Sequence, residues 1–207
     1  MDISSDNSKI LRVGGALGFD FMNTNYKRSE RIEVFDSPEA VLFWLMDSKL
    51  ITEKEAKTIK SRLGKNELNR LLQDSLDLRA KLRAFMLTFK EKGARGVAKE
   101  DLKYFNEILR KGQVQNQIEV HGENHFHLVR THEWKCVEEI LALVVESVFT
   151  TLATEDFDLI RKCENAKCQV WFVDRGKNHR RKFCSQAICG NRAKQAAFRE
   201  RHSHSHE

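Results

Sequence analysis

The sequence predicts an α+β protein, in which a mainly helical N-terminal region with one β-hairpin precedes a small cysteine-rich module. Three observations predict this division. Apolar residues recur at helical spacing through most of the N-terminal region, two alternating segments near residue 120 interrupt that pattern, and four of the five cysteines lie in the last quarter of the chain. With 207 residues and a hydrophobic share of 41%, the chain can form one domain or two small ones with a buried core.

The first elements are marked by capping residues. Residues 15–24 form a short buried segment whose secondary structure the pattern does not define. Ser37-Pro38 indicates a helix start, because serine caps the first turn and proline suits the first helical position. Thr52 and Glu55 have the spacing of a capping box, which predicts that a second helix begins there.

Two longer helices follow. Leucines and phenylalanines share one face over residues 66–92, which predicts a long amphipathic helix ended by Gly93. A further helix is expected over residues 99–111, because apolar side chains again recur at helical spacing and Gly112 provides a stop. These helices should supply most of the core of the N-terminal region.

The period of the pattern then changes. Residues 115–120 and 126–131 alternate apolar and polar side chains around a polar turn, which predicts a β-hairpin. Residues 133–152 return to a helical and very apolar pattern, so another helix is expected there. Residues 154–162 then connect to the cysteine-rich module.

The sequence favours a cytoplasmic location and gives no sign of a membrane partner. The longest uninterrupted apolar stretch, residues 140–145, is far too short to span a bilayer. The N-terminus lacks the basic region followed by an apolar stretch that a secretory signal needs. Thiols stay reduced in the cytoplasm, so closely spaced cysteines there favour a metal over a disulfide.

The cysteine spacing is the most specific signal in the chain. Cys163 and Cys168 are separated by four residues, as are Cys184 and Cys189, and fifteen residues lie between the pairs. Two such pairs predict one tetrahedral site for a structural Zn²⁺. The alternative is a set of disulfide-paired or simply buried cysteines. Four thiolate ligands leave no open position for a metal-bound water, so we do not expect an enzyme. The fifth thiol, Cys136, falls in an apolar segment and is interpreted as a small core residue.

The module is expected to have a treble-clef-like arrangement. Residues 170–174 and 182–183 are rich in β-formers and flank Gly176, which suggests a second hairpin after the first cysteine pair. Good helix-forming sequence follows Cys189, so the last ligand should lie in the first turn of a helix. A module of about forty residues has too little core to fold alone, so zinc binding should supply folding free energy. Metal removal is accordingly expected to unfold this module and leave the helical region intact.

The positive charge of the chain is concentrated in the same module. From Arg161 to Arg201 there are twelve lysines and arginines against three acids, whereas acids slightly exceed bases elsewhere. A local basic patch is typical of contact with a phosphate backbone, although a solvated helix face would have similar composition. The candidate nucleic-acid-binding residues are Arg175, Lys177, Arg180, Arg181, Arg192, Lys194, Gln195 and Arg199.

A cluster of polar residues near the N-terminus allows two interpretations. Asp20, Asn23 and Thr24 lie beside two phenylalanines and could form part of a small-ligand pocket. Aspartate and asparagine also cap turns and helix starts through their side chains, and this second interpretation is favoured.

The module resembles a known family. The string Cys189-Gly-Asn-Arg192 resembles the signature of the CGNR zinc-finger family, and the first knuckle and the Phe183-Cys184-Ser185 segment are similar too. Ala166 and Phe183 depart conservatively from residues common in that family. The segment from Leu17 to Thr24 and the Ser37-Pro38 helix resemble the opening of the ABATE domain, which precedes this finger in the family.

The resemblance implies a bacterial, stress-associated transcription regulator whose zinc finger binds DNA. It implies an ABATE-like domain over residues 1–155 and a finger over 160–202. The low-complexity tail, residues 203–207, is expected to be disordered. The first domain would act as a sensor of a small-molecule effector or as a homodimerisation domain. The alternative is a zinc-stabilised module that binds a protein or RNA without specific DNA binding.

Overall fold

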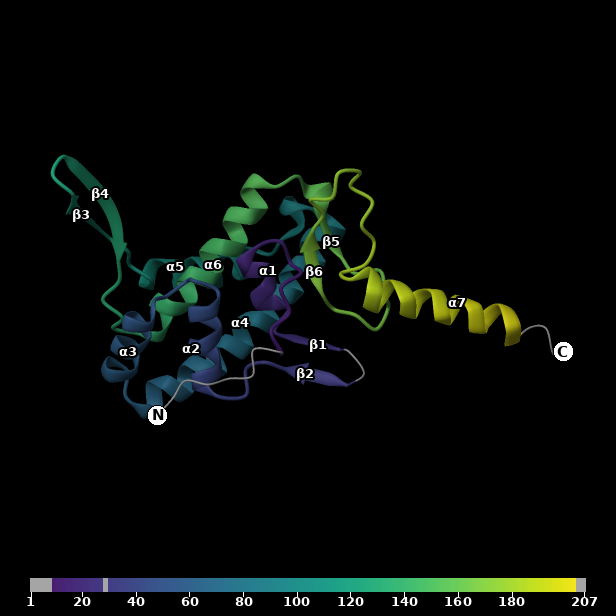
Figure 1. Cartoon of the computed structure of the whole chain (residues 1–207), viewed down its shortest axis with the longest axis horizontal. Helices are drawn as coiled ribbons and strands as arrows, with labels where there is room; N and C mark the ends of the chain where they lie inside the picture. The colour runs from purple at the N-terminus through teal and green to yellow at the C-terminus, as the bar shows by residue number, and fades with distance from the viewer. Residues whose placement is uncertain (1–8, 28–29, 204–207) are drawn as a thin grey trace. The chain divides into compact units, whose positions relative to one another are not determined.

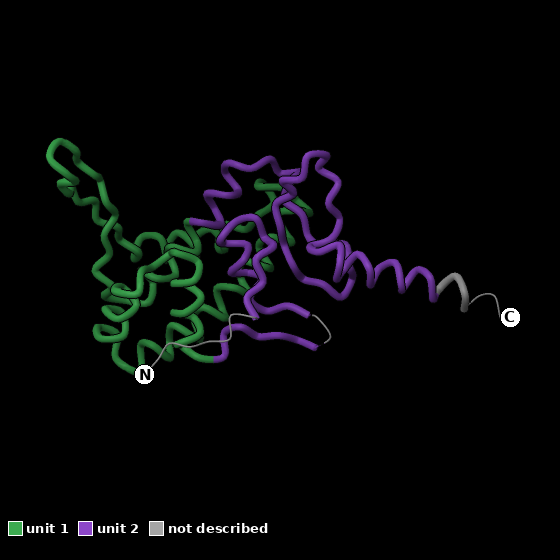
Figure 2. The backbone as a smooth tube through the Cα atoms, viewed as in Figure 1, with its two compact units in different colours: residues 1–5, 37–146 green, residues 6–36, 147–207 purple. Residues whose placement is uncertain are grey.

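The computed structural model describes residues 9–27 and 30–203 of the chain (Figure 1). Within this part, the chain forms two compact units: unit 1 contains residues 37–146, and unit 2 contains residues 9–36 and 147–203 (Figure 2). The units therefore do not follow the sequence boundary expected near residue 155. The N-terminal segment belongs to the same unit as the cysteine-rich module.

Unit 1 is mainly helical, as predicted. Its elements are α2 (Pro38–Asp47), α3 (Glu53–Arg62), α4 (Lys65–Lys92), the short 3-10 turn η2 (Ala94–Gly96), α5 (Lys99–Lys111), β3 (Gln115–His121), β4 (His125–Thr131) and the first part of α6 (Val137–Thr154). The Oγ atom of Ser37 accepts a hydrogen bond from the Ala40 amide at 3.2 Å. Thr52 and Glu55 form the predicted capping box at the start of α3. No helix among the residues described has the length and apolar character needed to cross a membrane.

The core of unit 1 lies along α4. The buried face of this helix includes Leu71, Leu78 and Leu82, and α4 packs against α2. The ring of Phe85 meets Phe105 of α5 edge-on, with 5.5 Å between the ring centroids. The apolar periodicity of the sequence thus corresponds to the buried face.

The start of α6 differs from the prediction. The helix was expected from residue 133 but begins at Val137. The Glu139 carboxylate accepts hydrogen bonds from the amides of Trp134 and Lys135, at 2.7 and 2.8 Å, and Trp134 has a positive φ of 53°. Because Glu139 holds the chain in this turn, Cys136 lies just before the helix, half-buried, and not within it.

Unit 2 combines the N-terminal segment with the cysteine-rich module. Its elements are α1 (Leu17–Met22), β1 (Asn25–Lys27), β2 (Arg31–Glu33), the end of α6, the 3-10 turn η3 (Phe157–Leu159), β5 (Ile160–Lys162), β6 (Trp171–Val173), the π-helical turn η4 (Gln186–Gly190) and α7 (Asn191–Ser203). β1 pairs with β2, and β5 pairs with β6, both antiparallel. Of the tail expected to be disordered, Ser203 ends α7, and residues 204–207 lie outside the described part.

The predicted hairpin of the module has a different partner strand. β6 lies within the expected segment 170–174, but it pairs with β5, which precedes the first cysteine, and not with residues 182–183. The carboxylate of Asp174 accepts hydrogen bonds from the amides of Gly176 and Arg181, at 3.0 and 2.8 Å. The chain after β6 therefore turns around this carboxylate, which prevents it from folding back along the strand.

Hydrogen bonds join the N-terminal segment to β6. The side-chain amide of Asn23 donates to the carbonyl of Trp171 at 2.8 Å and accepts from its amide at 3.0 Å. The carbonyl of Gly14 accepts from the Val173 amide at 2.8 Å. A Cβ atom on Gly18 would lie 2.4 Å from a methyl group of Val148, so only glycine lets α1 approach the end of α6 this closely. The N-terminal segment is thus part of the fold of the module.

A buried carboxylate links three helices of unit 1. Glu138 of α6 accepts hydrogen bonds from Arg70 of α4 at 2.6 Å and from Lys111 of α5 at 2.8 Å. Burial alone would raise the pKa of Glu138, but the bonds from Lys111 and Arg70 outweigh it and lower the pKa to about 2. The charged form is therefore favoured in the folded protein.

We expect Glu138→Gln to lower the free energy of unfolding by about 1–3 kcal/mol at neutral pH. Because the folded pKa lies below the unfolded value, this stabilisation is present above about pH 5 and declines as pH falls toward 2. Urea unfolding of wild type and variant at several pH values measures the difference. Glu53→Gln is the matched control, since its ion pair with Lys57 is exposed and should contribute little. A difference that stays constant down to pH 2 would contradict this role of Glu138.

Candidate metal centre and nucleic-acid interface

The four predicted ligands converge on one point. The Sγ atoms of Cys163, Cys168, Cys184 and Cys189 all lie within 4.8 Å of one another, and all four residues are buried. The Cys168 and Cys184 sulfurs are 3.8 Å apart, and the Cys184 and Cys189 sulfurs are 3.6 Å apart. A tetrahedral site with Zn–S bonds of about 2.3 Å requires sulfur separations of about 3.8 Å, so the geometry fits. All five cysteines lie in the described part of the chain, and none forms a disulfide.

Local turns place each pair of cysteines. In the first pair, the Cys163 amide donates to the Val170 carbonyl at 2.9 Å, and the Cys168 amide donates to the Asn165 carbonyl at 2.8 Å. In the second pair, the Oγ atom of Ser185 accepts from the Ile188 amide at 3.3 Å and caps the turn η4. Cys189 lies in η4, directly before α7, in agreement with the predicted position at a helix start.

Ionisation of one of the four thiols makes ionisation of the others less favourable. Hydrogen bonds from Cys168 and Cys184 lower the pKa of Cys163. The pKa of Cys184 is raised, because its hydrogen bonds to Cys163 and Cys168 favour the protonated form and burial adds to the effect. Four thiolates at these distances repel strongly, and a divalent cation at their centre would remove that opposition. The donor set therefore suits a thiolate-bound metal.

Asp174 organises the basic loop between the two cysteine pairs. Its side chain is fully buried, and besides the two loop amides it faces Arg161 across 3.9 Å. Burial raises the pKa of this carboxyl, but the amides of Arg181 and Gly176 outweigh burial and lower it. Sequence reasoning did not assign this role to Asp174, although Asp-x-Gly is a signal for a side-chain-closed turn.

Two of the predicted nucleic-acid-binding arginines have partners within unit 2. The guanidinium of Arg181 lies over the ring of Phe172, 4.1 Å from its centroid. It also donates to the carbonyls of Phe183 at 3.1 Å and Val13 at 3.2 Å, and to that of Cys184. Arg175 donates to the Gly15 carbonyl at 2.6 Å and pairs with Glu155. These contacts give both arginines a structural role.

The last two residues of the Cys-Gly-Asn-Arg string make similar structural contacts. Asn191 donates to the Ala187 carbonyl at 3.1 Å and joins η4 to α7. Arg192 is half-buried and donates to the Lys27 carbonyl at 3.5 Å. The motif thus supplies one sulfur ligand and two side chains that fix the start of α7.

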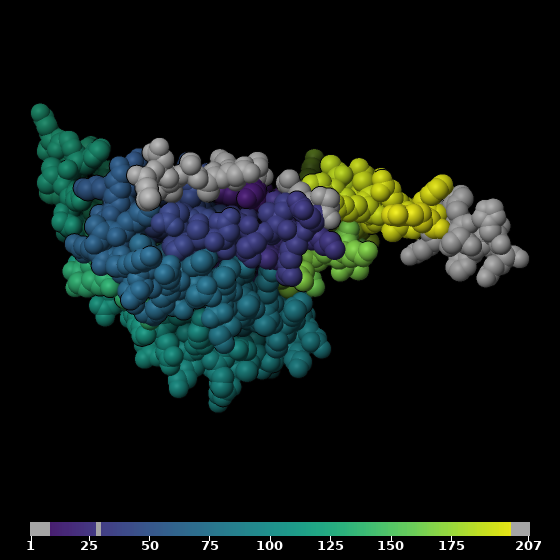
Figure 3. Space-filling model, turned by 90° about the horizontal axis from the view of Figure 1, so that it is seen from below, coloured from purple at the N-terminus to yellow at the C-terminus, as the bar shows by residue number. Residues whose placement is uncertain are grey.

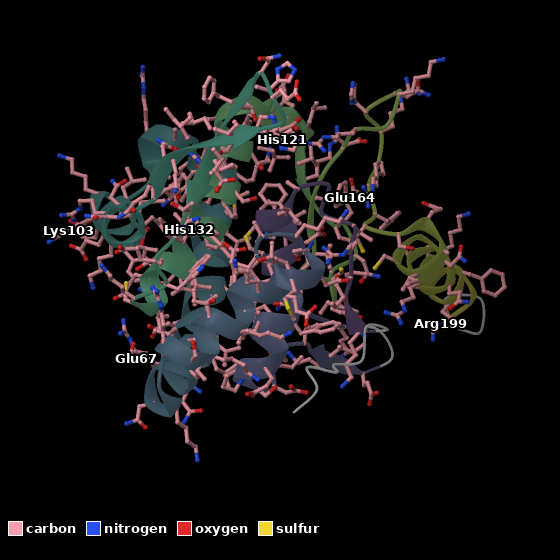
Figure 4. The ribbon with its side chains drawn as sticks, turned by 60° about the vertical axis from the view of Figure 1, so that its left-hand side comes forward. Glu67, Lys103, His121, His132, Glu164 and Arg199 are labelled. Atoms are coloured by element: carbon pink, nitrogen blue, oxygen red, sulfur yellow. The ribbon has the colours of Figure 1, made fainter. Side chains whose placement is uncertain are left out.

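The remaining candidates are exposed. Lys194, Gln195 and Arg199 lie on α7 and, with Phe198, line a shallow hollow on its surface. In the space-filling view the yellow residues of α7 extend outward from the rest of unit 2 (Figure 3), and Figure 4 labels Arg199 on this helix. Lys177 and Arg180 are exposed in the loop. Neither has an ion-pair partner among the residues that the structure describes. We call Lys177, Arg180, Lys194, Gln195 and Arg199 together the exposed basic set.

The candidate ligand-pocket residues all have internal partners. An oxygen of Asp20 accepts from the amides of Val13 and Gly14, at 3.1 and 2.8 Å. Asn23 pairs with Trp171, and the hydroxyl of Thr24 donates to the Phe21 carbonyl at 2.8 Å. These bonds make all three side chains partners of a turn or a strand.

Comparison with protein families identifies both regions of the chain. Residues 15–155 match the ABATE family, described as "Putative stress-induced transcription regulator", and residues 160–202 match the CGNR zinc finger. No curated protein matches this chain. The first match covers more than half of the chain, and the second contains all four clustered cysteines. The chain therefore belongs to the ABATE family and carries a C-terminal CGNR zinc finger.

Proposed function

We propose that this protein is a DNA-binding transcription regulator in which the zinc finger contacts duplex DNA through α7 and the loop before it. The observation that carries the proposal is the exposed basic set beside a closed four-cysteine site. The family description points to the same class of function. We further propose that the protein acts in the cytoplasm, where the four thiols would stay reduced.

The metal in this proposal is a single structural Zn²⁺ held by the four thiolates. Zinc favours sulfur ligands and a closed tetrahedral shell, and bound here it would supply free energy of folding to unit 2. Cys163, Cys168, Cys184 and Cys189 would use all four coordination positions. A closed shell leaves no site for an activated water, so the proposal assigns the protein no enzymatic activity.

The proposed contact uses the exposed end of unit 2. An α-helix fits the major groove of DNA, and α7 has 13 residues, or about 20 Å of helix. Gln195 offers a side chain that can read a base edge, while Lys194 and Arg199 carry charge for phosphates or bases. Lys177 and Arg180 in the loop would contact phosphate groups beside the groove.

The zinc assignment predicts one metal ion per chain. Serine at any of the four ligand positions should abolish stoichiometric zinc, because three thiolates cannot close the shell. Cys136→Ser is the matched control and should keep one zinc, since Cys136 lies outside the cluster. Metal analysis of the purified variants measures both. Full zinc retention in Cys189→Ser, or loss in Cys136→Ser, would refute the assignment.

Chelation should affect the N-terminal segment as well as the finger. Because Asn23 and Gly14 are hydrogen-bonded to β6, loss of zinc should increase amide hydrogen exchange over residues 13–24 and 160–190 together. Helix α4, in unit 1, should keep its protection. Hydrogen exchange with and without chelator measures this. Protection of residues 13–24 that persists while the finger exchanges would show that the two segments fold independently.

DNA binding should depend steeply on salt. If the four cationic residues of the exposed basic set each neutralise a phosphate, the slope of log affinity against log salt should be about −4. Arg180→Ala should reduce the slope by about 1 and weaken all sequences alike. Gln195→Ala should instead reduce the preference among sequences. Titration of random and selected duplexes at several salt concentrations measures these effects.

The controls separate a lost contact from lost folding. Lys103→Ala removes one exposed charge from α5 and should leave the slope unchanged. Arg181→Ala should destabilise unit 2, because its guanidinium satisfies internal carbonyls. If the zinc-loaded wild type binds no duplex at low salt, the DNA proposal is wrong. The basic helix would then have to serve an RNA or protein partner.

A further inference from the structure

The β3–β4 hairpin has an exposed apolar face. Its register places Ile118 opposite Leu128 and Val120 opposite Phe126. Alternate residues of a strand point to the same side, so these four side chains share one face of the hairpin. They are between 70% and 74% exposed, the highest values among the large apolar residues described. Figure 1 shows the two strands projecting from the helices of unit 1.

This face is unusual for a hairpin exposed to water. An isolated two-stranded hairpin is at best marginally stable, and contiguous exposed apolar residues mark interaction sites. The opposite face of the same strands is polar: Gln117 and Glu119 alternate with the apolar residues, and the ring of His127 stacks on His121 at 4.4 Å. The four apolar residues, which we call the hairpin patch, contain no charge and so do not suit a nucleic acid.

The charges at the two ends of the hairpin complement each other. Arg130 follows Leu128 on the same side of β4, at the base of the patch. Its guanidinium is paired with Glu146 at 2.8 Å, but its side chain is 63% exposed. Glu123 lies exposed in the turn at the tip. If two copies pack patch to patch in opposite directions, Glu123 of each copy lies near Arg130 of the other, and the two-fold symmetry makes this contact twice.

We propose that the hairpin patch binds a second copy of this chain, forming a two-fold symmetric dimer by antiparallel face-to-face packing. Burying one such side chain removes on the order of 100 Å² of apolar surface, so the eight side chains remove roughly 800 Å². The smallest stable interfaces bury about 1,200 Å² in total. The backbone and the polar residues at tip and base, which pack around the patch, supply the remainder. The inference does not rest on DNA binding.

The test is the oligomeric state of the full-length, zinc-loaded protein without DNA. Sedimentation velocity from low to high micromolar concentration should show a reversible dimer of the wild type. Ile118→Lys should weaken it by about 100-fold, because losing one buried isoleucine costs about tenfold and the symmetric interface loses two. The matched control is Gln117→Lys, one residue away on the polar face, which should dimerise like the wild type.

A charge-reversal cycle tests the antiparallel arrangement and also applies if Ile118→Lys fails to fold. Glu123→Arg and Arg130→Glu should each weaken the dimer, and the double variant should recover part of the loss. Circular dichroism and zinc content confirm folding of each variant. A monomeric wild type would overturn the proposal and leave the patch to another partner. Equal weakening by Gln117→Lys and Ile118→Lys, or a double variant weaker than both single variants, would also overturn it.

Discussion

Unit 2 depends on the convergence of four buried sulfurs at one point. The strands β5 and β6 have three residues each, and η4 is a single turn, so little regular structure holds this part of the chain together. Short elements with a small apolar core do not fold stably by themselves. A metal ion bound by the four sulfurs would cross-link the turn after β5 to the turn before α7 and would supply what the core lacks. The direction in which α7 leaves the module follows from the position of Cys189.

The same constraint extends to the N-terminus of the chain. β6 needs a hydrogen-bonding partner on the side away from β5, and the side-chain amide of Asn23 provides one by mimicking a peptide group. Gly14 pairs with Val173 along the same edge. Segments far apart in the sequence therefore share one compact unit, although family comparison divides the chain between residues 155 and 160. A change at the metal site would consequently affect the structure of the N-terminal segment that is hydrogen-bonded to β6.

Basic residues of the finger divide into two groups with different physical roles. Arginines with several fixed donors satisfy carbonyl groups inside the loop, as Arg161 does at His179 and Arg181 does at Phe183. Lys177, Arg180, Lys194 and Arg199 instead remain at the surface. Composition alone could not separate these groups, because each contributes the same charge to the module. Burial and hydrogen bonding separate them, and the positive surface is smaller than the sequence charge implies.

The sequence by itself determined the elements that depend on neighbouring residues. Caps at Ser37 and Thr52, the apolar face of α4, the β3–β4 hairpin and the four ligands all follow from local spacing, because each involves residues within a turn or a short motif. Tertiary structure decided the strand partner of β6, the pairing of Asn23 with Trp171 and the internal role of Arg181. These features join residues up to 168 positions apart. Such contacts form only when the whole chain has folded, so no local sequence pattern predicts them.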